Sequence, residues 1–116
     1  GADGIKATMS KKTFEDPALV QLYSSIQAFN TEFSFSRLSN LSRQEDQVDR
    51  SRLKNMKVPT LIISGEEDPL FLPEQLSDLV PYFHDAKIEL VTDAGHSPYF
   101  EQPHIFNRLL QEHVQN

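Results

Sequence analysis

An acid and a histidine of this sequence each follow a short apolar run, and together they could move protons. Asp68 comes after the run 60–64, and His96 comes after the run 88–91. A histidine whose tautomer is fixed by a carboxylate can take a proton from a hydroxyl and later give it to a leaving group. These two residues therefore predict the base and the acid of a nucleophilic triad.

Two predicted strands have to bring Asp68 and His96 together. Residues 58–64 and 87–92 are rich in β-branched and aliphatic side chains, and the first run is typical of a strand buried on both faces of a parallel sheet. Parallel strands of an open α/β sheet end at the edge where ligands bind. Gly65 and Pro69 flank the acid, which favours an abrupt turn and then an extended backbone that would hold the carboxylate.

Helices are expected on either side of these strands. Pro73 begins a crossover helix through about residue 80, and Pro103 begins a last helix with one apolar face. Nearer the N-terminus, Asp16 and Pro17 predict the start of a helix of about 13 residues, and a second helix is expected at about 36–44. Residues 45–54 are mostly polar and predict a surface connection. The fold class is therefore α/β, with a helical first part and a β-α-β-α second part.

Other residues that could carry chemistry are weaker candidates. Asp93 is a rival acid for His96, but it follows the second strand directly and is expected to cap the turn. Ser64 and Ser97 are poor nucleophiles, because Ser64 ends a strand, Ser97 precedes a proline, and the sequence contains no Gly-x-Ser-x-Gly. The histidines have no compact ligand spacing, so we expect no metal or other cofactor.

Composition limits the classes of function. The 116 residues are 38% hydrophobic with a net charge of −6, which allows one folded domain but gives no basic surface for nucleic acid. No uninterrupted apolar run exceeds three residues, far below the roughly 20 that cross a bilayer. The absence of cysteine excludes disulfides and thiolate metal sites. We expect no nucleic-acid partner, no membrane and, by default, a cytoplasmic location.

Two segments of the sequence resemble the acid strand and the histidine loop of the α/β-hydrolase fold superfamily. Segment 57–68, Lys-Val-Pro-Thr-Leu-Ile-Ile-Ser-Gly-Glu-Glu-Asp, ends on Asp68. Segment 93–103, Asp-Ala-Gly-His-Ser-Pro-Tyr-Phe-Glu-Gln-Pro, contains His96. Their order, their spacing and the trailing Glu-Gln-Pro make the resemblance specific, and with the last helix it covers about residues 53–116. The chain is thus expected to be the C-terminal part of a larger hydrolase.

The resemblance implies a role for each part of the chain. Residues 1–52 would belong to the cap or lid, and residues 53–116 to the C-terminal part of a hydrolase core whose sheet is incomplete here. Asp68 would be the triad acid and His96 the base, while Glu101 and Pro103 would be structural and fix the start of the last helix. The nucleophile, a serine or an aspartate, would lie outside this chain, which alone would be inactive. The complete protein would hydrolyse an ester, amide, carbon–carbon or related bond of a small molecule.

A non-catalytic interpretation stays open. Because no nucleophile is found, the chain could instead be an interaction module that keeps the hydrolase frame and binds a partner through an open sheet edge. Two parallel strands cannot cover their own faces and edges. We therefore expect the isolated chain to associate with itself or to pair with the missing N-terminal part.

Overall fold

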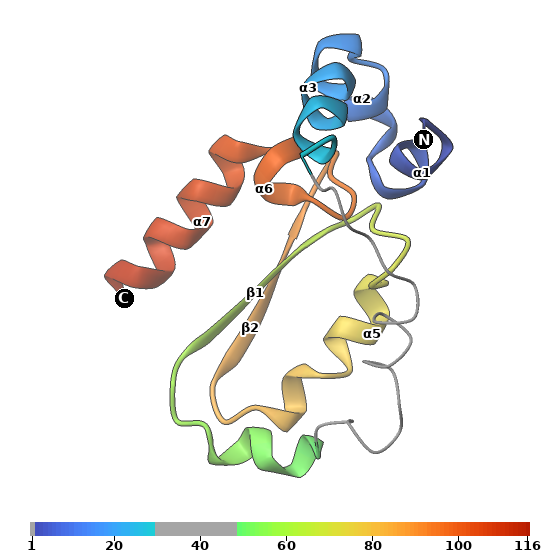
Figure 1. The fold of residues 1–116 in the computed structure, drawn as a ribbon. Coiled ribbons are helices and arrows are strands. Elements are labelled where there is room, and N and C mark those ends of the chain that lie inside the picture. The colour runs from blue at the N-terminus through green and yellow to red at the C-terminus, as the bar shows by residue number, and fades with distance from the viewer. Residues whose placement is uncertain (1, 30–48) are drawn as a thin grey trace.

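The computed structural model describes residues 2–29 and 49–116, and its sheet is a pair of parallel strands (Figure 1). Strand β1 (Thr60–Gly65) pairs with β2 (Ala86–Val91) along its whole length, with Ile62 opposite Ile88. This pairing confirms the predicted α/β class. The strand bounds differ from the predicted ones by only one or two residues.

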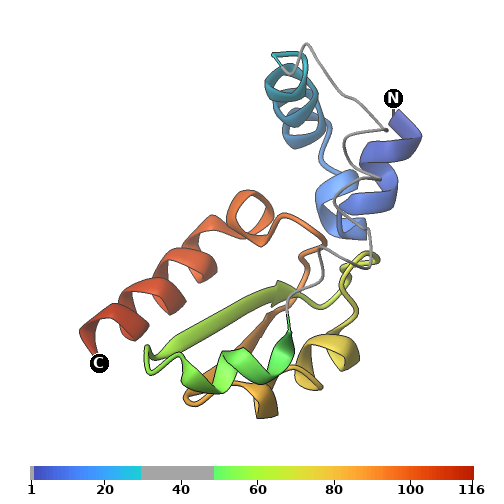
Figure 2. The same ribbon diagram turned by 60° about the horizontal axis from the view of Figure 1, so that its bottom comes forward.

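Two helices lie on opposite sides of the sheet (Figures 1 and 2). Helix α5 (Pro73–Ser77) is in the crossover between the strands, and α7 (Pro103–Gln115) follows the second strand. Each begins at a proline, as predicted. Helix α5 is shorter than the expected helix through residue 80. It ends at Ser77, and a separate 3-10 helix, η3 (Val80–Tyr82), contains Pro81, which cannot donate a backbone hydrogen bond to extend an α-helix.

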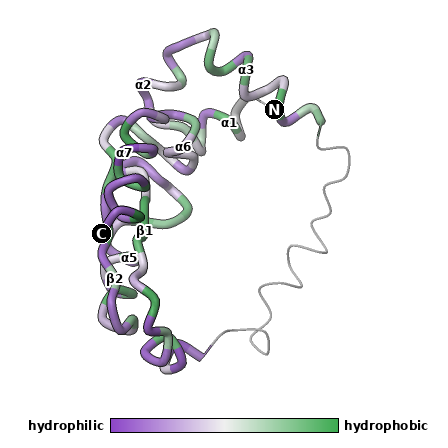
Figure 3. Tube along the Cα trace, turned by 90° about the vertical axis from the view of Figure 1, so that its left-hand side faces the viewer, coloured by the Kyte–Doolittle hydropathy of each residue, from purple (hydrophilic) through white to green (hydrophobic). Residues whose placement is uncertain are grey.

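The N-terminal part is helical, as predicted, but it is broken into short pieces. Helices α1 (Ala2–Thr8), α2 (Lys11–Phe14) and α3 (Pro17–Gln27) follow one another. The carboxylate of Asp16 accepts hydrogen bonds from two amides of the first turn of α3, which confirms it as the N-cap. Figure 3 shows both hydrophobic and hydrophilic stretches along α2 and α3.

Two expectations for the connecting region have different outcomes. The helix expected at 36–44 lies outside the described residues. Of the polar connection expected at 45–54, residues 45–48 lie outside the described residues. The described part leads into a 3-10 helix, η2 (Arg50–Asn55), which Asp49 caps. None of the helices in residues 2–29 and 49–116 is long and apolar enough to span a membrane.

The most buried residues gather at the carboxyl ends of the strands. Val91 and Ala94 are fully buried there, and Met9 in the N-terminal part is only 6% exposed. By contrast, β1 is half-buried from Thr60 to Ile63. The expectation of a strand buried on both faces is therefore wrong for this chain, because β1 has a single strand neighbour among the described residues.

Candidate active site

Asp68 lies in a tight turn directly after β1, and backbone amides hold its carboxylate. The residue is 5% exposed. Its Oδ1 accepts hydrogen bonds from the amides of Leu70, at 2.8 Å, and Phe71, at 3.2 Å. An aspartate that bonds to amides two and three residues further along fixes the conformation of its own turn. The carboxylate is thus oriented by its own turn, whatever lies opposite it.

His96 lies in the turn after β2, and the structure brings its ring against Asp68. The distance from Nδ1 of His96 to Oδ2 of Asp68 is 3.0 Å, and the distance to Oδ1 is 3.3 Å. The ring of Phe71 stacks on the imidazole with centroids 5.8 Å apart and planes inclined by 19°. The His96 side chain remains 35% exposed. Asp68 engages Nδ1, which leaves Nε2 as the ring nitrogen available for chemistry.

Asp93, the rival acid, is engaged elsewhere. Its side chain accepts a hydrogen bond from Nζ of Lys12 at 3.1 Å. It is the one described non-glycine residue with positive φ, at 56°, a conformation that aspartate tolerates in turns. Its carbonyl oxygen accepts hydrogen bonds from Ser10 and Gln102. Asp93 therefore shapes the turn, and Asp68 is the carboxylate that meets His96.

Two glycines allow the acid turn and the histidine turn to touch. A Cβ on Gly65 would collide with the backbone of Ala94 and Gly95, and a Cβ on Gly95 would lie 2.5 Å from the carbonyl oxygen of Thr8. None of the described glycines has positive φ. The abrupt turn expected after Gly65 is present, since the amide of Asp68 donates to the carbonyl oxygen of Gly65, but it does not depend on a positive φ at the glycine. The position needs glycine because another stretch of backbone passes beside it.

Glu101 is a buried carboxylate at the centre of the histidine turn. It ends the short helix α6 (Pro98–Glu101) and is 5% exposed. Its Oε2 accepts hydrogen bonds from the amides of Gly95, at 2.9 Å, and Ser97, at 3.1 Å. The resemblance implied a structural role for Glu101 at the start of the last helix. Its carboxylate instead binds the amides of the two residues that flank His96. Nothing in the position of Glu101, two residues before the helix that begins at Pro103, indicated these contacts.

Residues of the N-terminal part also reach the site, which the sequence did not predict. The amide of Ser10 donates to Oε1 of Glu101 at 2.6 Å, and the amide of Lys11 donates to Oε2 of Glu67 at 2.9 Å. The carbonyl oxygen of Thr8 accepts a hydrogen bond from the amide of His96 at 2.7 Å. The one local signal was Ser10, a good N-cap residue, which caps α2.

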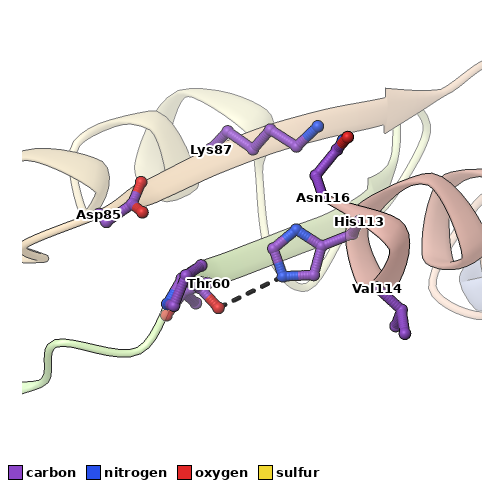
Figure 4. A pocket seen from close by; sticks show the side chains of 7 residues that line it. Thr60, Asp85, Lys87, His113, Val114 and Asn116 are labelled. Atoms are coloured by element: carbon purple, nitrogen blue, oxygen red, sulfur yellow. Dashed lines mark hydrogen bonds between the residues drawn. The ribbon is translucent and has the colours of Figure 1, made fainter.

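Two hollows lie at opposite ends of the strands. One, of about 330 Å³, lies beside the acid–histidine pair and has a mainly apolar wall; it is lined by Ile62, Ile63, Ser64, Asp68, Phe71, Leu76, His96 and Pro98. The other, of about 530 Å³, lies where the strands begin (Figure 4). There Nε2 of His113 lies 3.3 Å from the carbonyl oxygen of Pro59. Of the two, only the first contains the pair.

Within residues 2–29 and 49–116, no three histidine, aspartate or glutamate side chains lie together as metal ligands would.

No protein-family model matches the sequence, but two curated relatives match part of it. A Bacillus subtilis (strain 168) protein, provisionally named 2-succinyl-6-hydroxy-2,4-cyclohexadiene-1-carboxylate synthase, is 34% identical over 64 residues, which are 53% of this chain and 22% of that protein. A pimeloyl-(acyl-carrier protein) methyl ester esterase of Nitrosospira multiformis is 32% identical over 57 residues, which are 49% of this chain and 22% of that protein. The chain therefore corresponds to about a fifth of each relative.

A solved structure matches nearly the whole chain. MGS-M2, an α/β-hydrolase enzyme from a Medee basin deep-sea metagenome library, is similar with a TM-score of 0.71 and 26% identity over 97% of this chain and 42% of that one. The chain has part of the α/β-hydrolase fold, as its two motifs predicted. It spans less than half of the length of that structure, and its two strands form an incomplete part of an α/β sheet.

Proposed function

We propose that this chain is the acid-and-base part of a hydrolase with a nucleophile–histidine–acid triad. The 3.0 Å contact between Nδ1 of His96 and Oδ2 of Asp68, at the carboxyl ends of two parallel strands, carries the proposal. The buried carboxylate would hold the imidazole in the tautomer with its proton on Nδ1. The parent protein would supply the nucleophile from outside this chain.

The proposed mechanism follows from which ring nitrogen is available. Nε2 of His96 takes a proton from the nucleophile or from a water molecule, and the ionised Asp68 stabilises the imidazolium that forms. The same proton then passes to the leaving group. Ser64 and Ser97 are 5% and 6% exposed, and in the described part of the chain neither hydroxyl is hydrogen-bonded to the His96 ring. A nucleophile from another part of the protein fits this arrangement better.

A carboxylic ester is the bond to test first. The name of the Nitrosospira multiformis relative, a methyl ester esterase, supports it. The apolar wall of the hollow beside His96 suits an apolar acyl portion of the substrate. Amides and carbon–carbon bonds are the next classes in the same assay.

The test uses the full-length protein that contains this chain, with hydrolysis of p-nitrophenyl esters as the assay. We expect His96→Ala to lower kcat by at least about a thousandfold and Asp68→Asn by about ten-thousandfold, because asparagine would favour the wrong tautomer. Asp93→Asn is the matched control for Asp68→Asn, because it makes the same substitution at the carboxylate that binds Lys12 instead of His96. It should change kcat by only a few-fold. Unchanged hydrolysis in His96→Ala would refute the proposal.

A binding function is the second candidate, and the open edge of β1 supports it. Among the described residues β1 has β2 as its one neighbour, so its other edge could accept a strand. The full-length coding sequence distinguishes the candidates. A Gly-x-Ser-x-Gly or Gly-x-Asp-x-Gly turn supports hydrolysis, while its absence supports binding.

A further inference from the structure

A short N-terminal segment contacts both turns of the acid–histidine pair. This segment, residues 8–12, is called the strap. Its carbonyl oxygen at Thr8 accepts a hydrogen bond from the amide of His96 at 2.7 Å, and its amide at Lys11 donates to Glu67, the neighbour of Asp68, at 2.9 Å. In Figures 1 and 2 the helices on either side of the strap, α1 and α2, lie at the end of the sheet where β1 and β2 finish. The strap thus spans the gap between the two turns.

The carboxylate of Glu101 joins the strap to the histidine turn. It accepts hydrogen bonds from three amides, one from the strap and two from the residues on either side of His96: Ser10 at 2.6 Å, Gly95 at 2.9 Å and Ser97 at 3.1 Å. A buried carboxylate is strongly destabilising unless its charge is compensated. Here backbone amides provide the compensation, so the charge of Glu101 holds three peptide groups in place.

These contacts determine the backbone around the imidazole. The amides of Gly95, His96 and Ser97 are consecutive, and all three are bound, two by Glu101 and one by Thr8. Only the two side-chain torsions of His96 remain, and Asp68 and the stacked Phe71 ring limit those. Misplacement of a reacting group by about 1 Å can lower a rate by about a hundredfold.

We propose that Glu101 and the strap are positioning groups for the acid–histidine pair. They would touch neither the substrate nor the reacting atoms. They would act by keeping a fixed distance between the His96 backbone and the Glu67–Asp68 turn. This inference rests on the proposed role of His96. Its test needs no hydrolysis, because it reads the hydrogen bond between His96 and Asp68 directly.

The first variant is Glu101→Gln, measured by NMR on the full-length protein that contains this chain. Glutamine has one acceptor oxygen in place of two, so at least one of the three amides would face an NH₂ group. We expect the Nδ1–H proton of His96, which hydrogen-bonds to Asp68, to shift or broaden, and the amides of residues 95–97 to exchange about 10- to 100-fold faster. Glu112→Gln makes the same change of charge in an exposed ion pair with Arg108, and should leave both signals unchanged.

The second variant isolates the contact on the acid side. Lys11→Pro removes the amide that donates to Glu67, at the first position of α2, where proline is well tolerated. Lys11→Ala keeps the amide and serves as its matched control. We expect the His96 Nδ1–H signal to change in Lys11→Pro and to remain as in the unmodified chain in Lys11→Ala.

The two variants separate positioning from general stability. A folded Glu101→Gln chain with an unchanged Nδ1–H signal would overturn the role of Glu101, and identical spectra for Lys11→Pro and Lys11→Ala would overturn that of the strap. If Glu101→Gln does not fold, Lys11→Pro decides the proposal. If the signals respond as expected while the full-length protein hydrolyses nothing, the positioning role stands and the proposed hydrolase function fails.

Discussion

The glycine at position 95 gives a sharp test of how the two halves of the chain meet. A Cβ at this position would lie 2.5 Å from the carbonyl oxygen of Thr8, 2.8 Å from the carbonyl carbon of Met9 and 2.9 Å from the amide nitrogen of Ser10. All three are backbone atoms, so no side chain can rotate away to make room. Gly95→Ala should therefore push the strap from the histidine turn.

The sign of the effect depends on two opposing contributions. Gly95 does not have positive φ, so alanine suits its backbone conformation and would stabilise by about 0.4–1 kcal/mol through the unfolded state. Overpacking costs about 1–3 kcal/mol, and more where the obstacle is backbone. We expect the steric contribution to be larger and the free energy of unfolding to fall by about 1–2 kcal/mol.

The assay is urea unfolding of the isolated chain, followed by circular dichroism. The control is Gly4→Ala in helix α1, where nothing lies within 4 Å of the added Cβ. That change should raise the free energy of unfolding by about 0.5–1 kcal/mol, because alanine is the better helix former. A Gly95→Ala chain as stable as the Gly4→Ala chain would refute the close approach of the strap to the histidine turn.

Two further predictions concern the η2 cap and the edge of the sheet. The pKa of Asp49 is lowered by hydrogen bonds from Ser51, first from its side chain and then from its backbone. The stability that Asp49 gives to η2 is therefore fully present above the unfolded-state pKa. It is lost as the pH falls through the lower folded-state pKa. The Ser51 amide resonance should move in that acidic range, below about pH 4, and in Asp49→Asn it should not, because an amide does not titrate there. The isolated chain should self-associate as its concentration rises, and light scattering would measure this. The amides of Thr60 and Glu66 point to β2, so those of Leu61 and Ile63 point to the open edge of β1, where they could pair with a strand of another copy. Leu61→Pro should lower association relative to Leu61→Ala, and a compact monomer of the unmodified chain at high concentration would contradict the prediction.

Local sequence determined the elements of this protein and the identity of its acid and histidine. The prolines at 17, 73 and 103 begin three helices where they were expected, because proline already has a helical φ and lacks the amide that a first turn leaves unpaired. Asp68 and His96 were found from their places after apolar runs, because parallel strands end at a common edge. The length of α5 was not predictable in the same way, since an isolated proline at 81 allows either a longer helix or a 3-10 turn.

Only the tertiary structure decided what holds the pair in place. Gly65, Gly95, Glu101 and the strap act through contacts between segments far apart in the chain, such as the 91 positions between Ser10 and Glu101. Periodicity and turn chemistry report on neighbours within a few residues, so they carry no signal of such contacts. A buried carboxylate such as Glu101 looks in the sequence like any exposed one. Its burial is tolerated only because three amides from two distant segments converge on it, and that convergence exists only in the folded chain.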